Sequence, residues 1–311
     1  MHRPTNKFSA LLVIAALVCG FTAVNVAGQP LERATPQTVT LGIISKINRA
    51  QIAEHFSDFV RYVASKLDPT SDIEGKVAIA PTPFELAKLI EQKKVDFYMD
   101  SPYPTYLIND AHGVAKLLLR RWKGGMAEYR SLIFTRRNGE ITRLEDLRGK
   151  LFVFEYPEST SGHFLPRSFL SQKGFKFTDK SRFDPYAAPT DIGYLFTYSQ
   201  GKLVDWVLSK KAAAGAFSDD DFARLEAHKR ADIAILARTQ PLPRQLISVR
   251  KDFAPALADR LKNVLLAMHE NDQGRQILKK TDDTTKFDRL PEGEAGLRRR
   301  LAEIFQPTEK N

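Results

Sequence analysis

VTLGIISKINRAQIAEHFSDFVRYVASKL, residues 39–67, decides the fold class of this chain, because it joins a buried strand to an amphipathic helix. Residues 39–44 form a continuous β-rich run, as in a strand covered on both faces. Apolar residues then recur at helical spacing from Ile52 to Leu67. The same order returns along the chain, with strands at 76–80, 95–99 and 115–119 and with helices from 83 and at 104–111. This βαβαβαβ order predicts a mainly parallel sheet covered by helices.

A second α/β unit follows from residue 129 onward. We expect strands at 129–135, 151–155, 212–217, 233–237 and 245–249, and helices at 142–147 and 163–172. Thr142 and Glu145 have the spacing of a capping box. Residues 192–208 have helical periodicity, and the chain after residue 250 is expected to be mostly helical. No Gly/Ser-rich linker separates the units, which indicates two lobes joined by extended crossings near Tyr129 and Arg238. Such crossings permit hinge closure around a ligand.

The composition excludes several classes of protein. A chain of 311 residues that is 43% hydrophobic and 27% charged is typical of about two globular domains. It is neither disordered, nor fibrous, nor a polytopic membrane protein. A single cysteine excludes a disulfide framework and a cysteine-based zinc site. The net charge of +10 is weak evidence for an anionic partner, and no nucleic-acid motif accompanies the scattered basic residues.

Residues 1–28 have the pattern of a secretory signal peptide. Arg3 and Lys7 form a positive start, and the apolar run LLVIAALV at 11–18 is too short to span a bilayer comfortably. Cys19 follows this run, but the bulky Val18 directly before it is a poor match to a lipidation site. We therefore expect ordinary cleavage without a lipid anchor, and a mature protein in the periplasm that lacks cysteine, as suits an oxidising compartment.

The segment EYPESTSGHFLPR, residues 155–167, carries the most specific signal for a ligand site. A strand ends, a turn containing Ser159, Thr160 and Ser161 follows, and a helix begins. Free backbone N–H groups and hydroxyls at a helix start bind anions, and in an open α/β sheet ligands bind at the carboxyl ends of strands. A plain Ser/Thr helix cap explains the same residues and stays open as the alternative. His163 also lies within reach of such a ligand.

Two other segments place polar residues after a strand. In DFYMDSPYPTY, residues 96–106, Asp100 could receive a ligand ammonium, and Ser101 and Tyr103 could donate hydrogen bonds to a polar ligand. Asp219 follows the predicted strand at 212–217 and could face the same cleft. Helix capping is the alternative for Asp100, Ser101 and Asp219.

Motifs of catalysis are missing from the sequence. The six histidines are dispersed, and no HExxH pair, nucleophile elbow, phosphate-binding Walker loop or dinucleotide fingerprint occurs. We therefore expect a binding protein rather than an enzyme, with no cofactor and no metal site.

Five segments together resemble one family: DSPYP at 100–104, RRWK at 120–123, EYRSLIF at 128–134, LEDLRGK at 144–150 and ESTSGHFLP at 158–166. They are similar to the phosphate/phosphite/phosphonate-binding (PhnD-like) substrate-binding proteins of ABC importers. The resemblance covers roughly residues 39–253. It implies the type II periplasmic-binding fold, with two α/β lobes, a hinge and a ligand cleft between the lobes.

The resemblance also implies functional residues. Family members hold an oxyanion with the turn that corresponds to Ser159, Thr160 and Ser161, and Tyr106 matches a first-lobe tyrosine. Phe84 stands where the family has another tyrosine. Thr190 or Asp191 replaces an expected histidine, and Asp100-Ser101 replaces an aromatic position. These departures remove oxyanion donors and add a carboxylate, which favours a zwitterion or an anion with a cationic end.

The expected organisation is a signal peptide at 1–28, a first lobe at 29–130 plus 236–311, and a second lobe at 131–235. The resemblance implies a monomer that delivers phosphonate, phosphate, phosphite or a related zwitterion to an ABC permease of the inner membrane. A ligand-occupancy sensor that acts on a membrane receptor is the alternative function, since the sequence is compatible with both.

Overall fold

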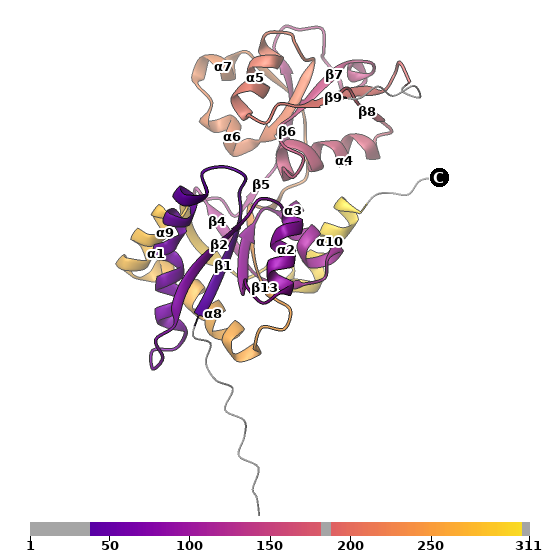
Figure 1. The fold of residues 1–311 in the computed structure, drawn as a ribbon. Helices are drawn as coiled ribbons and strands as arrows, with labels where there is room; N and C mark the ends of the chain where they lie inside the picture. Colours follow the sequence, from indigo (N-terminus) through magenta and orange to yellow (C-terminus); the bar gives the residue numbers. More distant parts are fainter. Residues whose placement is uncertain (1–37, 182–187, 307–311) are drawn as a thin grey trace, which may run out of the picture. The chain divides into compact units, whose positions relative to one another are not determined.

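The computed structural model describes residues 38–181 and 188–306. The expected signal peptide, with Cys19, lies outside these residues. Within them the chain forms two six-stranded sheets and a two-stranded ribbon (Figure 1). The strand order is β14-β4-β13-β3-β1-β2 in the first sheet and β11-β6-β10-β7-β9-β8 in the second.

The strands of the first sheet come from both ends of the described chain. They are β1 (Thr38–Ile44), β2 (Glu74–Ala80), β3 (Phe97–Asp100), β4 (Ala115–Lys123), β13 (Gln245–Arg250) and β14 (Thr284–Asp288). The second sheet uses the middle of the chain. Its strands are β6 (Ser131–Arg136), β7 (Leu151–Phe154), β8 (Phe177–Asp179), β9 (Ile192–Phe196), β10 (Ala214–Ser218) and β11 (Ile233–Arg238). The two connecting segments pair with each other as β5 (Glu128–Tyr129) and β12 (Leu242–Pro243).

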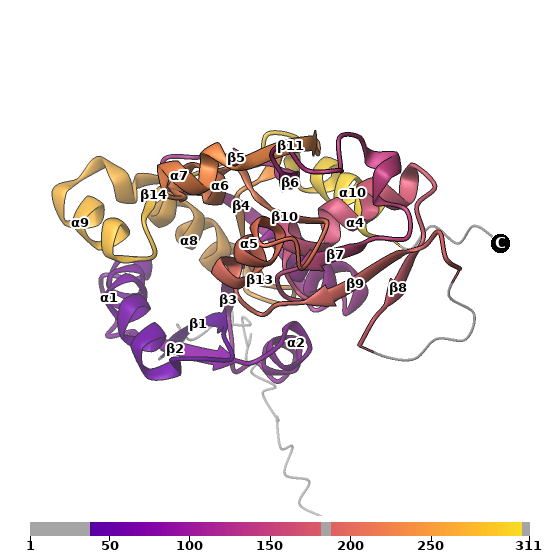
Figure 2. The ribbon, with the colours of Figure 1, turned by 90° about the horizontal axis from the view of Figure 1, so that it is seen from above.

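Helices cover both sheets, as Figure 2 shows from above. Those before the second sheet are α1 (Arg49–Leu67), α2 (Pro83–Glu91), α3 (Pro102–Tyr106) and the π-helical turn η1 (Leu107–Ala111). Those within the middle segment are η2 (Leu144–Leu147), η3 (Thr160–Phe164), α4 (Leu165–Gln172), α5 (Gln200–Leu208), α6 (Asp219–Arg224) and α7 (Ala227–Ala231). The remaining ones are α8 (Pro255–Ala267), η4 (Met268–Glu270), α9 (Asp272–Lys280) and α10 (Gly293–Phe305).

In each sheet, the parallel strands end at the same border, and the loops that follow them lie there. In the first sheet, β1 pairs in parallel with β2 and β3, while β13 lies antiparallel between β3 and β4. Asp100 at the end of β3 therefore lies opposite Leu246, next to the start of β13. In the second sheet, β7 is parallel to β9 and β10, and β6 is antiparallel to β10, which brings Ser131 opposite Ser218. We call these two borders the carboxyl edges of the first and the second sheet.

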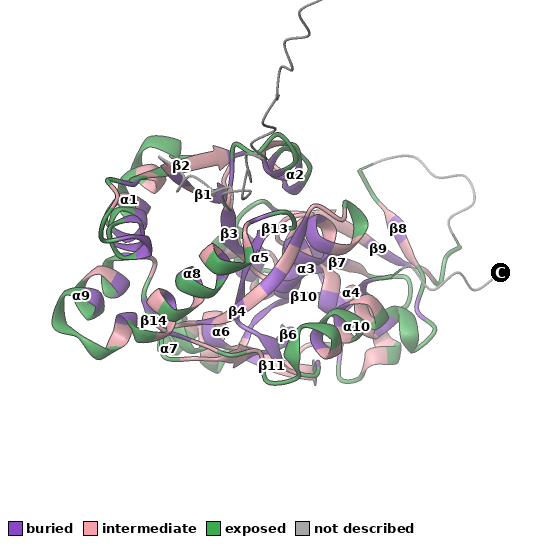
Figure 3. Cartoon of the chain, turned by 90° about the horizontal axis from the view of Figure 1, so that it is seen from below, coloured by how far each residue is buried: buried purple, intermediate pink, exposed green. Residues whose placement is uncertain are grey.

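Buried strands and one-sided helices build the core. In Figure 3 inner strands such as β3 and β10 are purple, strands such as β2 and β11 are largely pink, and the helices are green on their outer faces. α1 shows why the periodicity predicts its orientation. Its Phe59, Val60 and Val63 are fully buried in one apolar cluster with Leu41 of β1 and Leu261 of α8. The apolar run of the first strand and the period of the following helix thus meet in the same cluster.

Most of the predicted elements are confirmed, and the chain after residue 250 is mostly helical as expected. The first sheet is not mainly parallel, because β13 and β14 pair antiparallel with their neighbours. Two local expectations are also wrong. Residues 192–208 are not one helix, because β9 comes first and α5 begins only at Gln200, capped by Ser199. The chain after residue 250 also contains one strand, β14. Its five residues are too few for an alternation of polar and apolar side chains to be recognised in the sequence. In the short helix η2, Asp146 rather than Glu145 accepts the backbone N–H groups of Thr142 and Arg143.

Gly75 of β2 lies against the backbone of α1, and this contact gives a stability prediction. A Cβ atom at residue 75 would come within 2.6 Å of the carbonyl oxygen of Val60. We expect Gly75→Ala to lower the free energy of unfolding by about 1–3 kcal/mol, the usual cost of overpacking. Gly201→Ala on α5 is the control, since only Ser199 Oγ comes within 4 Å there. Guanidinium titration of both variants checks this, and equal midpoints would contradict the prediction.

Candidate functional site

The carboxyl edges of the two sheets meet at the side chain of Thr160. Its hydroxyl donates to the Ser101 hydroxyl at 3.0 Å and accepts the backbone N–H of Tyr103 at 2.9 Å. Thr160 begins η3 after β7, whereas Ser101 and Tyr103 follow β3. Lys46, just after β1, also forms an ion pair with Glu158 at 2.9 Å. The loops of both edges therefore border one site.

The turn at residues 159–162 begins a helix that is continuous from η3 into α4. Ser159 caps it, and its hydroxyl accepts the backbone N–H of Gly162 at 2.9 Å. Ser131 Oγ donates to the carbonyl of Ser161 at 2.6 Å and holds the turn against the start of β6. The backbone N–H groups of Thr160 and Ser161 belong to the first turn of the helix. The first N–H groups of a helix have no carbonyl acceptor within that helix. The turn therefore presents N–H donors and the positive end of a helix dipole at the carboxyl edge.

Gly162 is required by the close packing of this turn. A Cβ atom there would lie 2.8 Å from Ser159 Oγ and 2.9 Å from Cβ of Glu155. A side chain at residue 162 would thus push apart the cap and the end of β7. The absence of one lets the turn fold back onto the strand that it leaves.

Asp100 is the acceptor at the end of β3. Its Oδ1 accepts the backbone N–H of Ser101 at 2.6 Å and the Ser101 hydroxyl at 3.1 Å. Burial raises the pKa of this carboxyl to about 6, against the opposing effect of the two Ser101 bonds and of the charges on Arg121 and Lys123. A hydrogen-bonded chain thus runs from Thr160 through Ser101 to Asp100.

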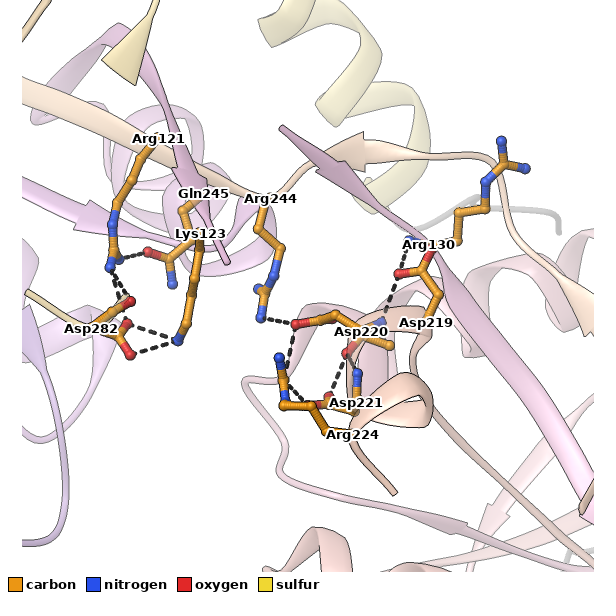
Figure 4. Close-up of polar contacts among 11 residues, drawn as sticks. Arg121, Lys123, Arg130, Asp219, Asp220, Asp221, Arg224, Arg244, Gln245 and Asp282 are labelled. Carbon is orange, nitrogen blue, oxygen red and sulfur yellow. Dashed lines mark hydrogen bonds and ion pairs between the residues drawn. The ribbon is translucent and has the colours of Figure 1, made fainter. Parts of the chain in front are cut away.

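Two cations on β4, the buried Arg121 and the half-buried Lys123, act on the charge of Asp100. Arg121 is only 1% exposed and donates to Thr284 Oγ1 at 2.7 Å. It also donates to Gln245, as Figure 4 shows. Asp282 neutralises both cations, with contacts of 3.2 Å to Arg121 and 2.7 Å to Lys123. Burial lowers the pKa of both Arg121 and Lys123. These cations are held in a structural network and raise the potential at the edge without presenting bare charges.

A second network joins the connecting ribbon to α6. Arg244 lies just after β12, and its guanidinium donates to Asp220 at 2.9 Å and stacks 4.5 Å from the ring centre of Tyr129. Arg224 contacts the same Asp220 oxygen at 3.0 Å, as Figure 4 shows. Arg244 Nε and Asp220 Oδ1 are buried and have no hydrogen-bond partner among the described residues. Arg244 and Asp220 neutralise each other, and their ion pair connects the ribbon to α6.

The structure brings some of the predicted site residues together and not others. Ser159, Thr160, Ser161, Asp100 and Ser101 form the turn and the chain described above. Tyr103 donates through its backbone, while its ring packs between Phe164 and Phe305. The Tyr106 ring is also used for packing, in the same apolar cluster. Asp219 accepts the backbone N–H of Arg130 at 3.1 Å and so ties α6 to the connecting segment.

Phe84 and Thr190 are not brought to the turn. The Phe84 side chain is 51% exposed on α2, where it lies against His112 and Lys88. Thr190 is exposed and precedes β9, which is parallel to β7. It therefore lies at the amino end of the second sheet, opposite to the edge that carries the turn.

Sequence reasoning missed Arg244, Asp282 and Glu155 as members of the site. Arg244 directly precedes β13, and Asp282 lies two residues before β14. Both strands run antiparallel to their neighbours, so a rule that looks after strands overlooks these residues. Glu155 directly follows β7. Burial raises its pKa to about 7, with a further contribution from the charge of Asp221.

The family of this chain follows from a comparison with known proteins. Residues 41–291 match the family described as ABC transporter, phosphonate, periplasmic substrate-binding protein. The chain belongs to this family. It is thus the periplasmic substrate-binding component of an ABC importer, a binding protein rather than an enzyme.

Solved structures extend the likeness to the whole fold. XAC2383 from Xanthomonas citri bound to ATP is 26% identical, with a TM-score of 0.78 over 87% of this chain and 100% of the other. The same protein bound to chloride ion is 28% identical over 86% of this chain and 96% of the other, with a TM-score of 0.77. PhnD1 from Prochlorococcus marinus in complex with methylphosphonate is 18% identical over 87% and 97%, with a TM-score of 0.63. The fold is the type II periplasmic-binding fold with two α/β lobes.

Neither a metal-binding cluster nor a membrane-spanning helix occurs in the part of the chain that the structure describes. In residues 38–181 and 188–306, no group of three His, Cys, Asp or Glu side chains is placed to hold a metal ion. No helix in these same ranges has the length and apolar character needed to cross a membrane.

Replacing the Thr160 hydroxyl tests its role in joining the two edges. Thr160→Val keeps the shape but leaves the Tyr103 N–H without its acceptor, and an unsatisfied buried donor costs about 1–3 kcal/mol. We expect a loss of that size in the free energy of unfolding. Thr190→Val, at an exposed position, is the control and should change the stability by less than about 0.5 kcal/mol. Equal losses in the two variants would refute the role.

The pKa of Asp100 predicts a pH dependence of stability. Because the folded pKa of about 6 lies above the ordinary value of 3.8, the folded state binds this proton more tightly than the unfolded state does. The stabilising contribution is complete below pH 3.8 and is lost as the pH rises through 6. The free energy of unfolding of the wild type, minus that of Asp100→Asn, should therefore fall between pH 4 and 6. Denaturant titrations across this range measure it, and a constant difference would contradict the pKa.

Proposed function

We propose that this protein binds a small phosphorus oxyanion, such as phosphonate, phosphate or phosphite, or a related zwitterion, between the carboxyl edges of its two sheets. The observation that carries the proposal is the turn at 159–162. It presents backbone donors at the start of a helix, directly beside residues of the other edge. Binding of such a ligand would bring the edges closer, and the loaded protein would deliver the ligand to an ABC permease.

The roles of the turn residues differ. The backbone N–H groups of Thr160 and Ser161 and the hydroxyl of Ser161 are proposed to contact the oxyanion. Among the described residues, no protein group hydrogen-bonds the Ser161 hydroxyl, whereas the hydroxyls of Ser159 and Thr160 already have protein partners. Thr160 would then act as a positioning residue that sets the turn against Ser101. Asp100 would accept a donor on the ligand, such as an ammonium group.

The relatives support a phosphorus ligand without fixing its size. PhnD1 holds methylphosphonate, and XAC2383 holds ATP. Both ligands carry a tetrahedral phosphorus oxyanion, and a helix start with free N–H groups suits that chemistry. The proposal is therefore restricted to the oxyanion and leaves the rest of the ligand to the other residues of the cleft.

The boundaries of the lobes also belong to this proposal. The first lobe would comprise residues 29–130 and the segment after the second crossing, and the second lobe the residues between. Since β11 continues to Arg238 in the second sheet, we place the second crossing after Arg238 rather than after residue 235. Hinge motion would then bend the ribbon formed by β5 and β12. Cleavage of the signal peptide, a monomeric state and the absence of nucleic-acid binding are further parts of the proposal.

A thermal-shift panel with the mature protein tests the ligand class. The panel holds phosphate, phosphite, methylphosphonate, 2-aminoethylphosphonate and sulfate. A ligand at a hundred times its dissociation constant should stabilise the protein by about 2.7 kcal/mol, which raises the melting temperature. The double variant Thr160→Ala/Ser161→Ala should fold and lose this shift, whereas Thr190→Ala should keep it. An unchanged shift in the double variant would remove the turn from the site, and no shift with any phosphorus compound would overturn the proposed function.

A further inference from the structure

Exposed apolar side chains lie at the carboxyl edges of both sheets. In the part of the chain that the structure describes, the large apolar side chains that are at least half exposed are Ile47, Phe84 and Tyr198. They follow β1, β2 and β9, which are strands with parallel neighbours. The ring of Phe84 is used in packing, since it lies against His112 and Lys88. Single exposed apolar residues are common on proteins, but Ile47 and Tyr198 both border the proposed oxyanion turn.

Tyr198 and Tyr156 form a pair of rings beside that turn. Their rings meet edge to face, with 5.8 Å between the ring centres. The backbone N–H of Tyr198 donates to the carbonyl of Glu155 at 2.9 Å. The carbonyl of Tyr156 accepts the backbone N–H of Ser159 at 3.1 Å. These backbone bonds hold both tyrosines at the loop that presents the oxyanion donors.

The backbone of Tyr198 lies in the left-handed region, with a φ of 54°. Seven non-glycine residues in the described part of the chain have a positive φ, and the other six are Asn, Lys or Asp. A bulky side chain is unfavourable in this region. Because Tyr198 is 58% exposed, burial within the protein does not offset this cost. Strained backbone of this kind is concentrated at functional sites, and here it presents a ring beside the turn.

Ile47 lies on the loop after β1, at the carboxyl edge of the first sheet. Its neighbour Lys46 forms the ion pair with Glu158, which joins this loop to the loop of the turn. The Ser45 hydroxyl donates to the carbonyl of Ile47 at 2.7 Å and fixes the loop. Ile47 itself is 66% exposed. The first sheet thus also presents an apolar side chain next to the turn.

We call Ile47, Tyr156 and Tyr198 the mouth patch. It combines apolar surface from both carboxyl edges beside the oxyanion turn. The patch contains no charged side chain, and the adjacent Lys46 and Glu158 neutralise each other. A charged group of a ligand therefore finds no ion-pair partner there, whereas an uncharged apolar group can cover the patch.

We propose that the mouth patch binds an aromatic ring of the ligand, so that the preferred ligands are phosphonates or phosphate monoesters that carry such a ring. This inference rests on the proposed function and adds the chemical class of the organic group. The phosphorus oxyanion would lie at the turn, and the ring would pack on Tyr198 and Ile47. A ring is favoured over an alkyl group because stacked or edge-to-face pairs of rings gain energy beyond the area that they bury.

Calorimetric titration of the mature protein with four phosphonates tests the class of the organic group. The ligands are methylphosphonate, 2-aminoethylphosphonate, cyclohexylmethylphosphonate and benzylphosphonate. Benzylphosphonate should bind about tenfold to a hundredfold more tightly than methylphosphonate, the range for burying one apolar side chain. It should also bind about twofold to tenfold more tightly than the cyclohexyl compound. Equal affinities of these two would show selection by apolar size alone, and tightest binding of 2-aminoethylphosphonate would show selection of a cation. Either result would overturn the inference.

Tyr198→Gly removes the ring and keeps the backbone, because glycine adopts a positive φ without a steric penalty. In this variant benzylphosphonate should lose about tenfold in affinity, while methylphosphonate stays within about threefold of the wild type. Phe84→Ala is the matched control, since it removes a half-exposed ring that packs on His112 and Lys88, and it should keep the wild-type ratio of the two ligands. Unchanged affinities in Tyr198→Gly would leave the patch to a protein partner, and equal losses for both ligands would show that residue 198 acts only through its loop. Both results would rule out the ring contact.

The outcomes separate this inference from the function on which it rests. If methylphosphonate binds and benzylphosphonate binds no more tightly, the function stands and the aromatic class is wrong. If no phosphonate binds the wild type, the proposed function fails together with the inference. The comparison of ligands uses the wild type alone, so it remains decisive if Tyr198→Gly is unstable.

Discussion

The contact between Thr160 and the chain after β3 is the constraint on which the site depends. One hydroxyl donates to Ser101 and accepts from the backbone of Tyr103, and it thereby aligns the helix start of one sheet with the strand end of the other. Parallel strands collect their carboxyl ends at one border, and each sheet alone would offer half a site. Because the hydroxyl of Thr160 is used in this contact, the proposed ligand contacts are the N–H groups beside it and the Ser161 hydroxyl.

Charge is distributed unevenly around this contact. The cations Arg121, Lys123 and Arg244 are buried or half-buried, and Asp282 and Asp220 compensate them at distances of 2.7–3.2 Å. A buried ion pair of this kind mainly avoids the cost of an unpaired charge. Among residues 38–181 and 188–306, the carboxyls of Asp100 and Glu155 form no ion pair, and burial raises the pKa of both. The proposed oxyanion donors are consequently backbone N–H groups and a hydroxyl rather than cations.

Much of the fold can be predicted from the sequence, because apolar runs and helical periods are local signals. The β1–α1 segment is the clearest example, since Leu41, Phe59 and Val63 enter one cluster. β14 and the split of residues 192–208 into β9 and α5 could not be predicted, because their pairing partners are distant in sequence. The candidate site likewise has one part that a local motif predicts and another part that depends on distant segments. The turn at Ser159–Ser161 is a local motif, whereas the position of Arg244 depends on antiparallel strands that return from far along the chain.

The departures at Phe84 and Thr190 illustrate why a family pattern needs the geometry of the individual chain. Both positions carry donors in the resemblance, yet Phe84 is half-exposed on α2 and Thr190 precedes β9 at the opposite border. A loss of donors at these positions therefore changes little at the turn itself. The acidic residues matter more, because a carboxylate accepts hydrogen bonds when ionised and cannot donate one.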